Sequence, residues 1–469
     1  MKKKDYILTS IIVIAIITLA IVCGGYFISA STKTNTFAKG TVFGGVDISG
    51  LDIDSAGGKV NGALDRLAES ARLTLRYNGQ EWTFGSGNFA VKSNAQNALE
   101  KVLRKGKAGK YYMDEDDGLK VEYVFNGMED KLEEVFADIE KDPADAEIIF
   151  DADKDDPFTI TPHVVGVTVD RARLCDEILN KLKTQDVVTI DIPVIQTMPN
   201  VLSDDLIKYT REQASFSTDF SKSSSQRKEN IRLAFNKING TRLESGEEFS
   251  FNNVVGERTV ENGFKEAKVI LGGEYENGIG GGVCQASTTL YNAVIRAGLD
   301  VLEVNHHSLP ASYVPLSLDA MVSWGYSDFR FVNNSDGPVF IKATTDDKNL
   351  YVKIYGNTLK ENQKIEPRAE LIKTIPHSGD KVIADTEGLY KDKIMFKGEY
   401  IRVSYPKEGY ESRAFLDFYE DGQKVDSKEI RHDTYNARQG VVYEGIEDLP
   451  EGMTLPANTV SIIPPQTNV

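Results

Sequence analysis

Cysteine is scarce in this chain, and positive charge is outnumbered by negative charge. Its 469 residues include three cysteines, too few for a disulfide scaffold. Its 54 lysines and arginines are outnumbered by 71 aspartates and glutamates, which gives a net charge of −17. An acidic surface of this kind argues against nucleic acid as a partner and against docking on anionic lipid headgroups.

Acidic residues gather in two clusters, at 114–118 and 151–156. Neither cluster has the alternating ligand pattern of a complete calcium loop, so we interpret both as solvated turns. We therefore expect that the protein uses no metal ion and no cofactor.

A long apolar run occupies residues 6–28, directly after the three lysines at 2–4. Its length is sufficient for a helix to cross roughly 30 Å of hydrocarbon, and the lysines place the N-terminus in the cytoplasm. We therefore predict that residues 1–31 are a cytoplasmic stub and transmembrane anchor, with the rest of the chain extracellular. The small residues at 29–31 would also suit a cleavage site, so a cleaved signal peptide is the alternative.

The segment around Cys284 is the part of the chain whose residue order best suits chemistry. Three glycines, Gly280 to Gly282, come directly before the cysteine, and apolar residues then recur at helical spacing until Gly298. This pattern predicts that Cys284 lies in the first turn of a helix. Unpaired N–H groups and the positive end of the helix dipole stabilise a thiolate there, and the thiolate is the nucleophilic form.

Partners for this thiol follow in the sequence. A strand predicted over 301–304 leads to His306 and His307. A thiol at a helix start followed by an imidazole after a strand is the order found in several cysteine enzymes. Either Asp319 or Asp328 could orient the imidazole, and spacing alone does not choose between them.

The same residues also have a structural interpretation. Glycine followed by a small thiol suits a close contact between a helix and a sheet, and free cysteine is among the most buried residue types. A single imidazole at a strand end often has no catalytic role. The sequence therefore leaves two alternatives, a reactive Cys284 and a packed one.

The N-terminal half of the chain contains an internal repeat. A strand, a helix, a hairpin and a second helix recur in the same order about 75 residues later, which predicts a tandem α+β duplication over 40–112 and 113–205. In its element order and in residues 160–169, the second copy resembles the peptidoglycan-binding repeat that precedes the catalytic domain of some L,D-transpeptidases. The resemblance implies that peptidoglycan is a partner, although a rigid spacer would explain the repeat equally well.

Further motifs carry a resemblance for residues 226–356. They are Arg227, Asn230, Ile231, the run 246–252, Val255, Gly256, Gly263, Phe264, Ala267, the glycine-cysteine run, Glu303, His307, Ser308, Asp319, Ala320, the run 328–331 and Asn333. Through them the chain resembles the VanW family, named after an accessory protein of glycopeptide-resistance clusters. The resemblance points to His307 rather than His306 as the partner of Cys284. An arginine common in the family after Glu303 is Val304 here, so its contacts are not carried over.

The resemblance and the residue types together favour a hydrolase or acyl-transfer site. In such a site Cys284 attacks and His307 accepts its proton, while Asp319 or Asp328 orients the ring. The side chain of Gln285, or backbone N–H groups at the helix start, would stabilise an oxyanion. The substrate-binding candidates are Gly281, Gly282, Ser287, Ser308 and Trp324.

The C-terminal part is rich in predicted strands. Those around Asp421 and Gly422 predict an antiparallel hairpin with a two-residue turn. The pattern resembles a G5-type domain, a small β fold of many surface proteins, and we place it at 368–450, followed by a flexible tail at 451–469.

We therefore predict an α+β, multidomain ectodomain behind one N-terminal transmembrane helix. It comprises tandem α+β repeats, a central α+β domain with the cysteine and histidine, and a small C-terminal β module. The predicted function is that of a membrane-anchored cell-wall protein, a cysteine-dependent hydrolase or acyl-transferase acting on peptidoglycan stem peptides. The alternative is a non-catalytic peptidoglycan-binding or scaffold protein associated with envelope maintenance or glycopeptide resistance.

Overall fold

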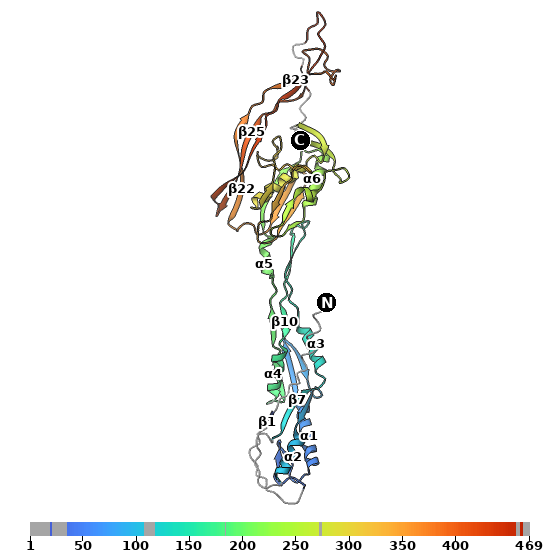
Figure 1. Cartoon of the computed structure of the whole chain (residues 1–469), viewed down its shortest axis with the longest axis vertical. Coiled ribbons are helices and arrows are strands. Elements are labelled where there is room, and N and C mark those ends of the chain that lie inside the picture. Colours follow the sequence, from blue (N-terminus) through green and yellow to red (C-terminus); the bar gives the residue numbers. More distant parts are fainter. Residues whose placement is uncertain are drawn as a thin grey trace. The chain divides into compact units, whose positions relative to one another are not determined.

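The computed structural model describes residues 19–20, 35–106, 118–182, 184–271, 274–455 and 460–462. The chain divides into two compact units (Figure 1). Unit 1 comprises Met1–Asp145 and His163–Val201, and unit 2 comprises Ala146–Pro162 and Leu202–Val469. Both units combine helices with strands, so the predicted α+β, multidomain class is confirmed.

The predicted membrane helix falls outside the described residues, apart from Leu19–Ala20. These two residues form the short strand β1, which pairs with β7 (Lys120–Phe125). Within the described ranges, no helix is both long and apolar enough to cross a membrane. The membrane anchor therefore stays a prediction.

Unit 1 contains two hydrophobic cores. The first lies around α1, whose buried residues Ala56, Val60, Leu64 and Ala68 recur every fourth position, as an amphipathic helix requires. The side chain of Asp52 caps this helix by accepting a hydrogen bond from the Ser55 backbone N–H at 2.7 Å. The elements around this core are β2 (Val42–Phe43), β3 (Val46–Asp47), α1 (Ile53–Ser70) and α2 (Ala95–Gly106).

The second core of unit 1 is formed by strands and helices from both predicted repeats. Its elements are β4 (Arg72–Tyr77), β5 (Gln80–Phe84), β6 (Phe89–Ser93), α3 (Glu129–Ile139), β10 (Gly166–Val169), α4 (Arg171–Leu182), β11 (Val187–Asp191) and β12 (Val194–Thr197). Strand β4 pairs in parallel with β11, and β6 pairs with β7. The two repeats therefore do not separate at residue 112, because each contributes strands to the sheets of the other. The hairpin of β8 (Glu147–Phe150) and β9 (Phe158–Thr161) belongs to unit 2 instead.

Unit 2 is centred on an antiparallel sheet in the order β13-β21-β20-β14. Helices α6 and α8 pack against this sheet and against each other, and the buried apolar side chains of all these elements form one core. The elements are β13 (Glu212–Asp219), α6 (Ser225–Ile238), β14 (Thr241–Leu243), α8 (Val283–Arg296), β20 (Val339–Thr345) and β21 (Asn349–Tyr355), with α5 (Ser203–Ile207) and the 3-10 helix η2 (Lys208–Thr210) before them.

Unit 2 also contains two smaller sheets. One has the order β15-β19-β18, and the other is the hairpin of β16 and β17, which runs directly into the glycines before Cys284. These elements are β15 (Glu248–Ser250), α7 (Phe251–Val255), β16 (Glu266–Leu271), β17 (Glu274–Ile279), β18 (Asp300–Glu303) and β19 (Arg330–Val332).

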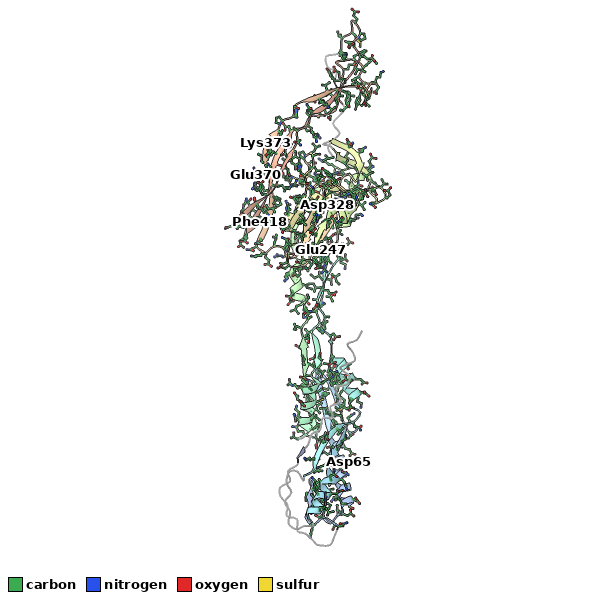
Figure 2. The ribbon with its side chains drawn as sticks, in the orientation of Figure 1. Asp65, Glu247, Asp328, Glu370, Lys373 and Phe418 are labelled. Carbon is green, nitrogen blue, oxygen red and sulfur yellow. The ribbon has the colours of Figure 1, made fainter. Side chains whose placement is uncertain are left out.

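The C-terminal module also belongs to unit 2. Strands β22 (Gln363–Ile375), β25 (Gly409–Glu420) and β26 (Gln423–Tyr435) form a long antiparallel ribbon, along which Figure 2 labels Glu370, Lys373 and Phe418. The turn between β25 and β26 is Asp421-Gly422, with φ values of 49° and 77°, as the sequence predicted.

Ala414 of this ribbon lies in the core of unit 2, with Ala369, Leu416 and Ile430 packed against it. A second sheet has the order β23-β27-β24-β28, formed by β23 (Asp380–Ala384), β24 (Tyr400–Ser404), β27 (Gly440–Glu444) and β28 (Val460–Ile462). Strand β28 lies in the segment 451–469, which was predicted as a flexible tail. Its three residues pair with β24, so for them that prediction was wrong.

Candidate active site

The three glycines before Cys284 allow other backbone segments to approach the start of α8. A Cβ on Gly281 would lie 2.6 Å from the carbonyl oxygen of Lys268 in β16, and a Cβ on Gly282 would lie 2.9 Å from Cγ of Arg227 in α6. Gly282 also has φ of 108° at the position that precedes the helix. The glycine run therefore holds the cysteine between a hairpin and a helix, in the predicted first turn of α8.

His307 and Asp319 face each other across an isolated antiparallel bridge. Asn305 pairs with Met321 in this bridge. His307, two residues after Asn305, therefore lies opposite Asp319, two residues before Met321. His307 Nδ1 donates to Asp319 Oδ2 at 2.6 Å, and the His307 backbone N–H donates to the same oxygen at 2.7 Å. Both side chains are buried, so this contact fixes the orientation of the imidazole.

Cys284 completes a chain of three groups. It is partly exposed, and it lies close enough to His307 for each side chain to shift the pKa of the other. In its neutral form the Cys284 thiol donates a hydrogen bond to the carbonyl oxygen of Val322, with 3.4 Å between the sulfur and the oxygen. The structure therefore brings Cys284, His307 and Asp319 together in the order required for nucleophile, base and orienting group.

The electrostatics of these three groups favour an ion pair between Cys284 and His307. Burial alone would raise the pKa of the Cys284 thiol, but the hydrogen bond and charge of His307, together with the Arg258 guanidinium, lower it below the usual value. Burial opposes the charged form of His307 as well, yet hydrogen bonds to Asp319 and Cys284 raise the pKa of His307 to about 10. Burial opposes ionisation of Asp319, but the hydrogen bonds and charge of His307, together with the charge of Arg431, lower the pKa of Asp319 to about 2. These directions favour a thiolate beside an imidazolium over the neutral pair.

The other aspartate candidate, Asp328, makes different contacts. Its Oδ1 accepts from the Asn252 backbone N–H at 2.9 Å, and its Oδ2 accepts from the Ser250 hydroxyl at 2.5 Å. Asp328, which Figure 2 labels, therefore holds the start of the short helix α7. Of the two alternatives, the structure places Asp319 next to the imidazole and Asp328 elsewhere.

The side chain of Gln285 is occupied by neighbouring groups. Its Nε2 donates to the carbonyl oxygen of Asp219 at 2.9 Å and to Thr218 Oγ1 at 3.2 Å, and its Oε1 accepts from Arg227 at 3.0 Å. This side chain is therefore not free to bind an oxyanion. The backbone N–H of Cys284 has no acceptor within the described part of the chain, so it is the oxyanion donor that the geometry offers.

A cavity of about 920 Å³ lies over Cys284 and His307. Three of the predicted substrate-binding residues, Gly281, Gly282 and Trp324, line it. The other two do not. Ser287 is fully buried and donates to the carbonyl oxygens of Cys284 and Ala320 at 3.0 and 2.7 Å, and Ser308 is exposed outside the cavity.

Two residues of the C-terminal ribbon also hold Asp319, and sequence reasoning missed both. The hydroxyl of Tyr435 in β26 donates to Asp319 Oδ1 at 2.8 Å, and the guanidinium of Arg431 in the same strand donates to the carbonyl oxygen of Asp319. Their position four residues apart on a predicted strand shows that they share a face. Nothing in the sequence indicates what that face contacts, because 116 residues separate Tyr435 from Asp319.

The ribbon supports the loop before Asp319 as well. Tyr435 accepts a hydrogen bond from the Ser317 backbone N–H at 3.0 Å, and the hydroxyl oxygens of Ser317 and Ser412 lie 2.7 Å apart. All three residues are buried. The C-terminal module therefore contributes to the positioning of the orienting aspartate.

Comparison with known proteins identifies the family of the central domain. A family model described as "VanW like protein" matches residues 226–355. The chain is 36% identical over 203 residues to "Uncharacterized protein YoaR" of Bacillus subtilis, an alignment that covers 43% of this chain and 67% of that protein. It is 26% identical over 167 residues to the vancomycin B-type resistance protein VanW of Enterococcus faecalis, covering 34% of this chain and 58% of that protein. The chain belongs to the VanW-like family, as its motifs predicted.

A second family model matches residues 69–191 and is described as "Putative peptidoglycan binding domain". It spans parts of both predicted repeats. Together with the VanW-like match, it supports a role related to the cell wall, with peptidoglycan as a partner.

A solved structure titled "IgA1 Protease G5 domain structure" is similar to part of the chain. The likeness has 13% identity and a TM-score of 0.13, and covers 18% of this chain and 94% of that one. A TM-score this low does not identify a shared fold, so the G5 assignment of residues 368–450 stays a prediction.

Proposed function

We propose that the VanW-like domain is a cysteine-dependent hydrolase or acyl-transferase that acts on amide bonds of peptidoglycan stem peptides. We also propose that the chain is anchored in the cell membrane through residues 6–28, with this domain outside. The observation that carries the chemistry is the buried hydrogen bond between His307 and Asp319, together with a cavity that both Cys284 and His307 line. The match of residues 69–191 supports the choice of substrate.

The reaction follows from the proton positions. The thiolate of Cys284 attacks the amide carbonyl carbon, and the backbone N–H of Cys284 stabilises the resulting oxyanion. The C–N bond then breaks as His307 Nε2 donates its proton to the leaving amine, which leaves a thioester on the sulfur. Water or an amine resolves the thioester while His307 takes up its proton. Throughout, Asp319 keeps the ring oriented and stabilises its charged form.

The alternative is a non-catalytic protein that binds or organises the wall. The match of residues 69–191 to a peptidoglycan-binding model supports such a role by itself, because binding does not require Cys284. The named relative VanW gives this alternative a further context in glycopeptide resistance. In that case Cys284 would only pack against the Val322 carbonyl group.

Digestion of purified sacculi separates the two functions. We expect the full chain to change the muropeptide profile, and Cys284→Ala to leave that profile unchanged while it still sediments with the sacculi. Loss of the reaction with retained binding would assign the chemistry to Cys284. A wild-type chain that sediments with the sacculi but alters no muropeptide would instead support the scaffold.

A further inference from the structure

The cavity over Cys284 has a lining of opposite charge to the molecule as a whole. The chain carries a net charge of −17. Besides His307, the charged residues that line the cavity are the cations Lys222, Arg227, Arg258 and Lys268 and the anions Asp219 and Glu257. Because the thiolate of Cys284 balances the imidazolium, the lining has a surplus of positive charge. An acidic protein that concentrates cations at one cavity creates a local attraction for anions.

Two of these cations lie directly against the glycine run. A Cβ on Gly280 would lie 2.8 Å from both Cβ and Cγ of Arg258, and a Cβ on Gly282 would lie 2.9 Å from Cγ of Arg227. The glycines therefore allow the stems of both arginines to pack next to the residues that carry the nucleophile. The three glycines therefore do two things: they allow the tight turn before Cys284, and they leave space for the two arginines beside it.

Neither arginine contacts a carboxylate in the described part of the chain. Arg227 donates to Ser223 Oγ at 3.2 Å and to Gln285 Oε1 at 3.0 Å, and both acceptors are uncharged. Within the described ranges, no carboxylate oxygen lies within 4.0 Å of the side-chain nitrogens of Arg227, Arg258, Lys222 or Lys268. The Asp219 carboxylate accepts from the Ser221 backbone N–H at 2.6 Å, and Glu257 is exposed.

Arg258 is the most unusual of the four. Its Nη1 donates to the carbonyl oxygen of Gly256 at 3.0 Å, while its Nη2 is buried and has no hydrogen-bond acceptor among the residues that the structure describes. Burial lowers the pKa of the Arg258 guanidinium, because removal from water disfavours the charged form. The charges of Cys284 and Asp328 favour the ionised guanidinium, and its Cζ lies 5.7 Å from the centroid of the Phe251 ring. None of these groups accepts a hydrogen bond from Nη2, and a buried donor without an acceptor is costly.

We propose that the cavity binds a carboxylate of the substrate, and that Arg258, with Arg227 at the other end of the glycine run, recognises it. The substrate class is then a peptide that carries a free carboxylate close to the amide bond attacked by Cys284. A guanidinium suits this task because its planar group of donors matches the two oxygens of a carboxylate. This inference rests on the proposed function and adds a substrate class to the same site.

Two alkylating reagents of similar size test the proposal. Iodoacetate carries a carboxylate and iodoacetamide carries the neutral amide in its place, and both react with the thiolate. We define the selectivity as the rate constant for iodoacetate divided by that for iodoacetamide, measured on the Cys284 peptide of the full chain by mass spectrometry. Because the thiolate fraction enters both rates equally, the selectivity reports only on recognition of the carboxylate.

We expect Arg258→Gln to lower the selectivity about tenfold, the effect of one lost charge-assisted contact. Arg258→Lys should retain most of it, and Arg227→Gln should lower it in the same direction. Arg232→Gln is the matched control, because it removes the same charge from α6 at a residue that does not line the cavity. The control should change the selectivity by less than about twofold, since exposed charges at a distance are screened.

The possible failures are distinguishable. An unchanged selectivity in both Arg258→Gln and Arg227→Gln overturns the carboxylate proposal, even if both reagents slow down together, because the arginines then act only on the thiolate. A slow reaction of wild-type Cys284 with iodoacetamide alone, at the rate of an ordinary thiol, contradicts the proposed function instead. If Arg258→Gln does not fold, Arg227→Gln and Arg258→Lys provide the same measurement.

Discussion

At the scale of single residues, Asp319 is the group on which the candidate site depends most. Its carboxylate accepts hydrogen bonds from the ring and the backbone of His307 and from the hydroxyl of Tyr435. These contacts keep the carboxylate ionised in a buried place, and the ionised carboxylate in turn keeps the imidazole charged. The reactivity of Cys284 therefore depends on a residue that does not contact it.

The pH dependence of stability tests this role of Asp319. The pKa of Asp319 is depressed to about 2 in the folded chain, so its ionised form stabilises the fold above its unfolded value of about 3.9. This contribution is lost as pH falls from about 4 towards about 2. We expect wild type to exceed Asp319→Asn in free energy of unfolding by roughly 2 kcal/mol above pH 4, with the difference shrinking below that pH.

The unfolding of unit 2 can be followed separately. Trp324 lies in unit 2 and Trp82 in unit 1, so a Trp82→Phe background leaves the tryptophan fluorescence of unit 2 alone. Asp328→Asn is the matched control, because it removes the same charge at the start of α7 rather than beside the imidazole. It should lower stability but leave the alkylation rate of Cys284 unchanged. Equal losses of alkylation rate in the two variants would contradict the assignment of Asp319.

Much of the residue-scale picture could be predicted from the sequence. The glycines and the helical spacing indicated a thiol at a helix start, and the family resemblance pointed to His307. The choice between Asp319 and Asp328 could not be made, because it depends on the register of an isolated bridge between Asn305 and Met321. The occupied side chain of Gln285 was also beyond prediction, since its partners lie 58 to 67 residues away.

At the scale of elements, the start of α8 is held by close approach of backbones. Gly281 has no space for a side chain, because a Cβ there would lie 2.6 to 2.8 Å from backbone atoms of Ala267 and Lys268. These atoms belong to β16 and cannot move without displacing the hairpin that leads to Cys284.

We therefore expect Gly281→Ala to destabilise unit 2 by about 2 kcal/mol or more, as overpacking does. Denaturant titration followed by Trp324 fluorescence measures this change. Gly58→Ala in the exposed part of α1 is the contrast, because a Cβ there meets no atom within 4 Å. It should stabilise unit 1 by up to about 1 kcal/mol, since alanine favours a helix. A neutral Gly281→Ala would disprove the close approach.

The elements themselves were easier to predict than their pairing. Hydrophobic spacing located the helices of the N-terminal half, and the Asp421-Gly422 turn located the longest hairpin. The spacing does not report which strands pair, so the exchange between β4 and β11 across the predicted repeat boundary was missed. Parallel pairing of strands that are distant in sequence leaves no local signal.

At the scale of the whole molecule, the C-terminal module is part of the candidate site. The VanW-like match ends at residue 355, yet Arg431 and Tyr435 beyond it bind Asp319. The ribbon that carries them shares the core of unit 2 through Ala414. The boundary of the family match is therefore not the boundary of the site.

Tyr435→Phe tests this connection. It removes one buried hydroxyl that donates to Asp319 and accepts from Ser317, so we expect a loss of about 2 kcal/mol in the stability of unit 2. We also expect a slower reaction of Cys284 with iodoacetamide at pH 7, because Asp319 is less firmly positioned. Tyr419→Phe on the same ribbon is the control and should change neither quantity. The connection fails if Tyr435→Phe behaves like this control.

The most direct test of the account is the pH profile of Cys284 alkylation by iodoacetamide in the full chain. Quantification by peptide mass spectrometry allows Cys175, whose pKa is raised by burial and by the charge of Asp176, to serve as an internal reference. We expect Cys284 in wild type to titrate below the ordinary thiol value of about 8.5, and His307→Gln to return its pKa to that value or above. A wild-type Cys284 that titrates at or above about 8.5, with no change in His307→Gln, would contradict the thiolate–imidazolium pair.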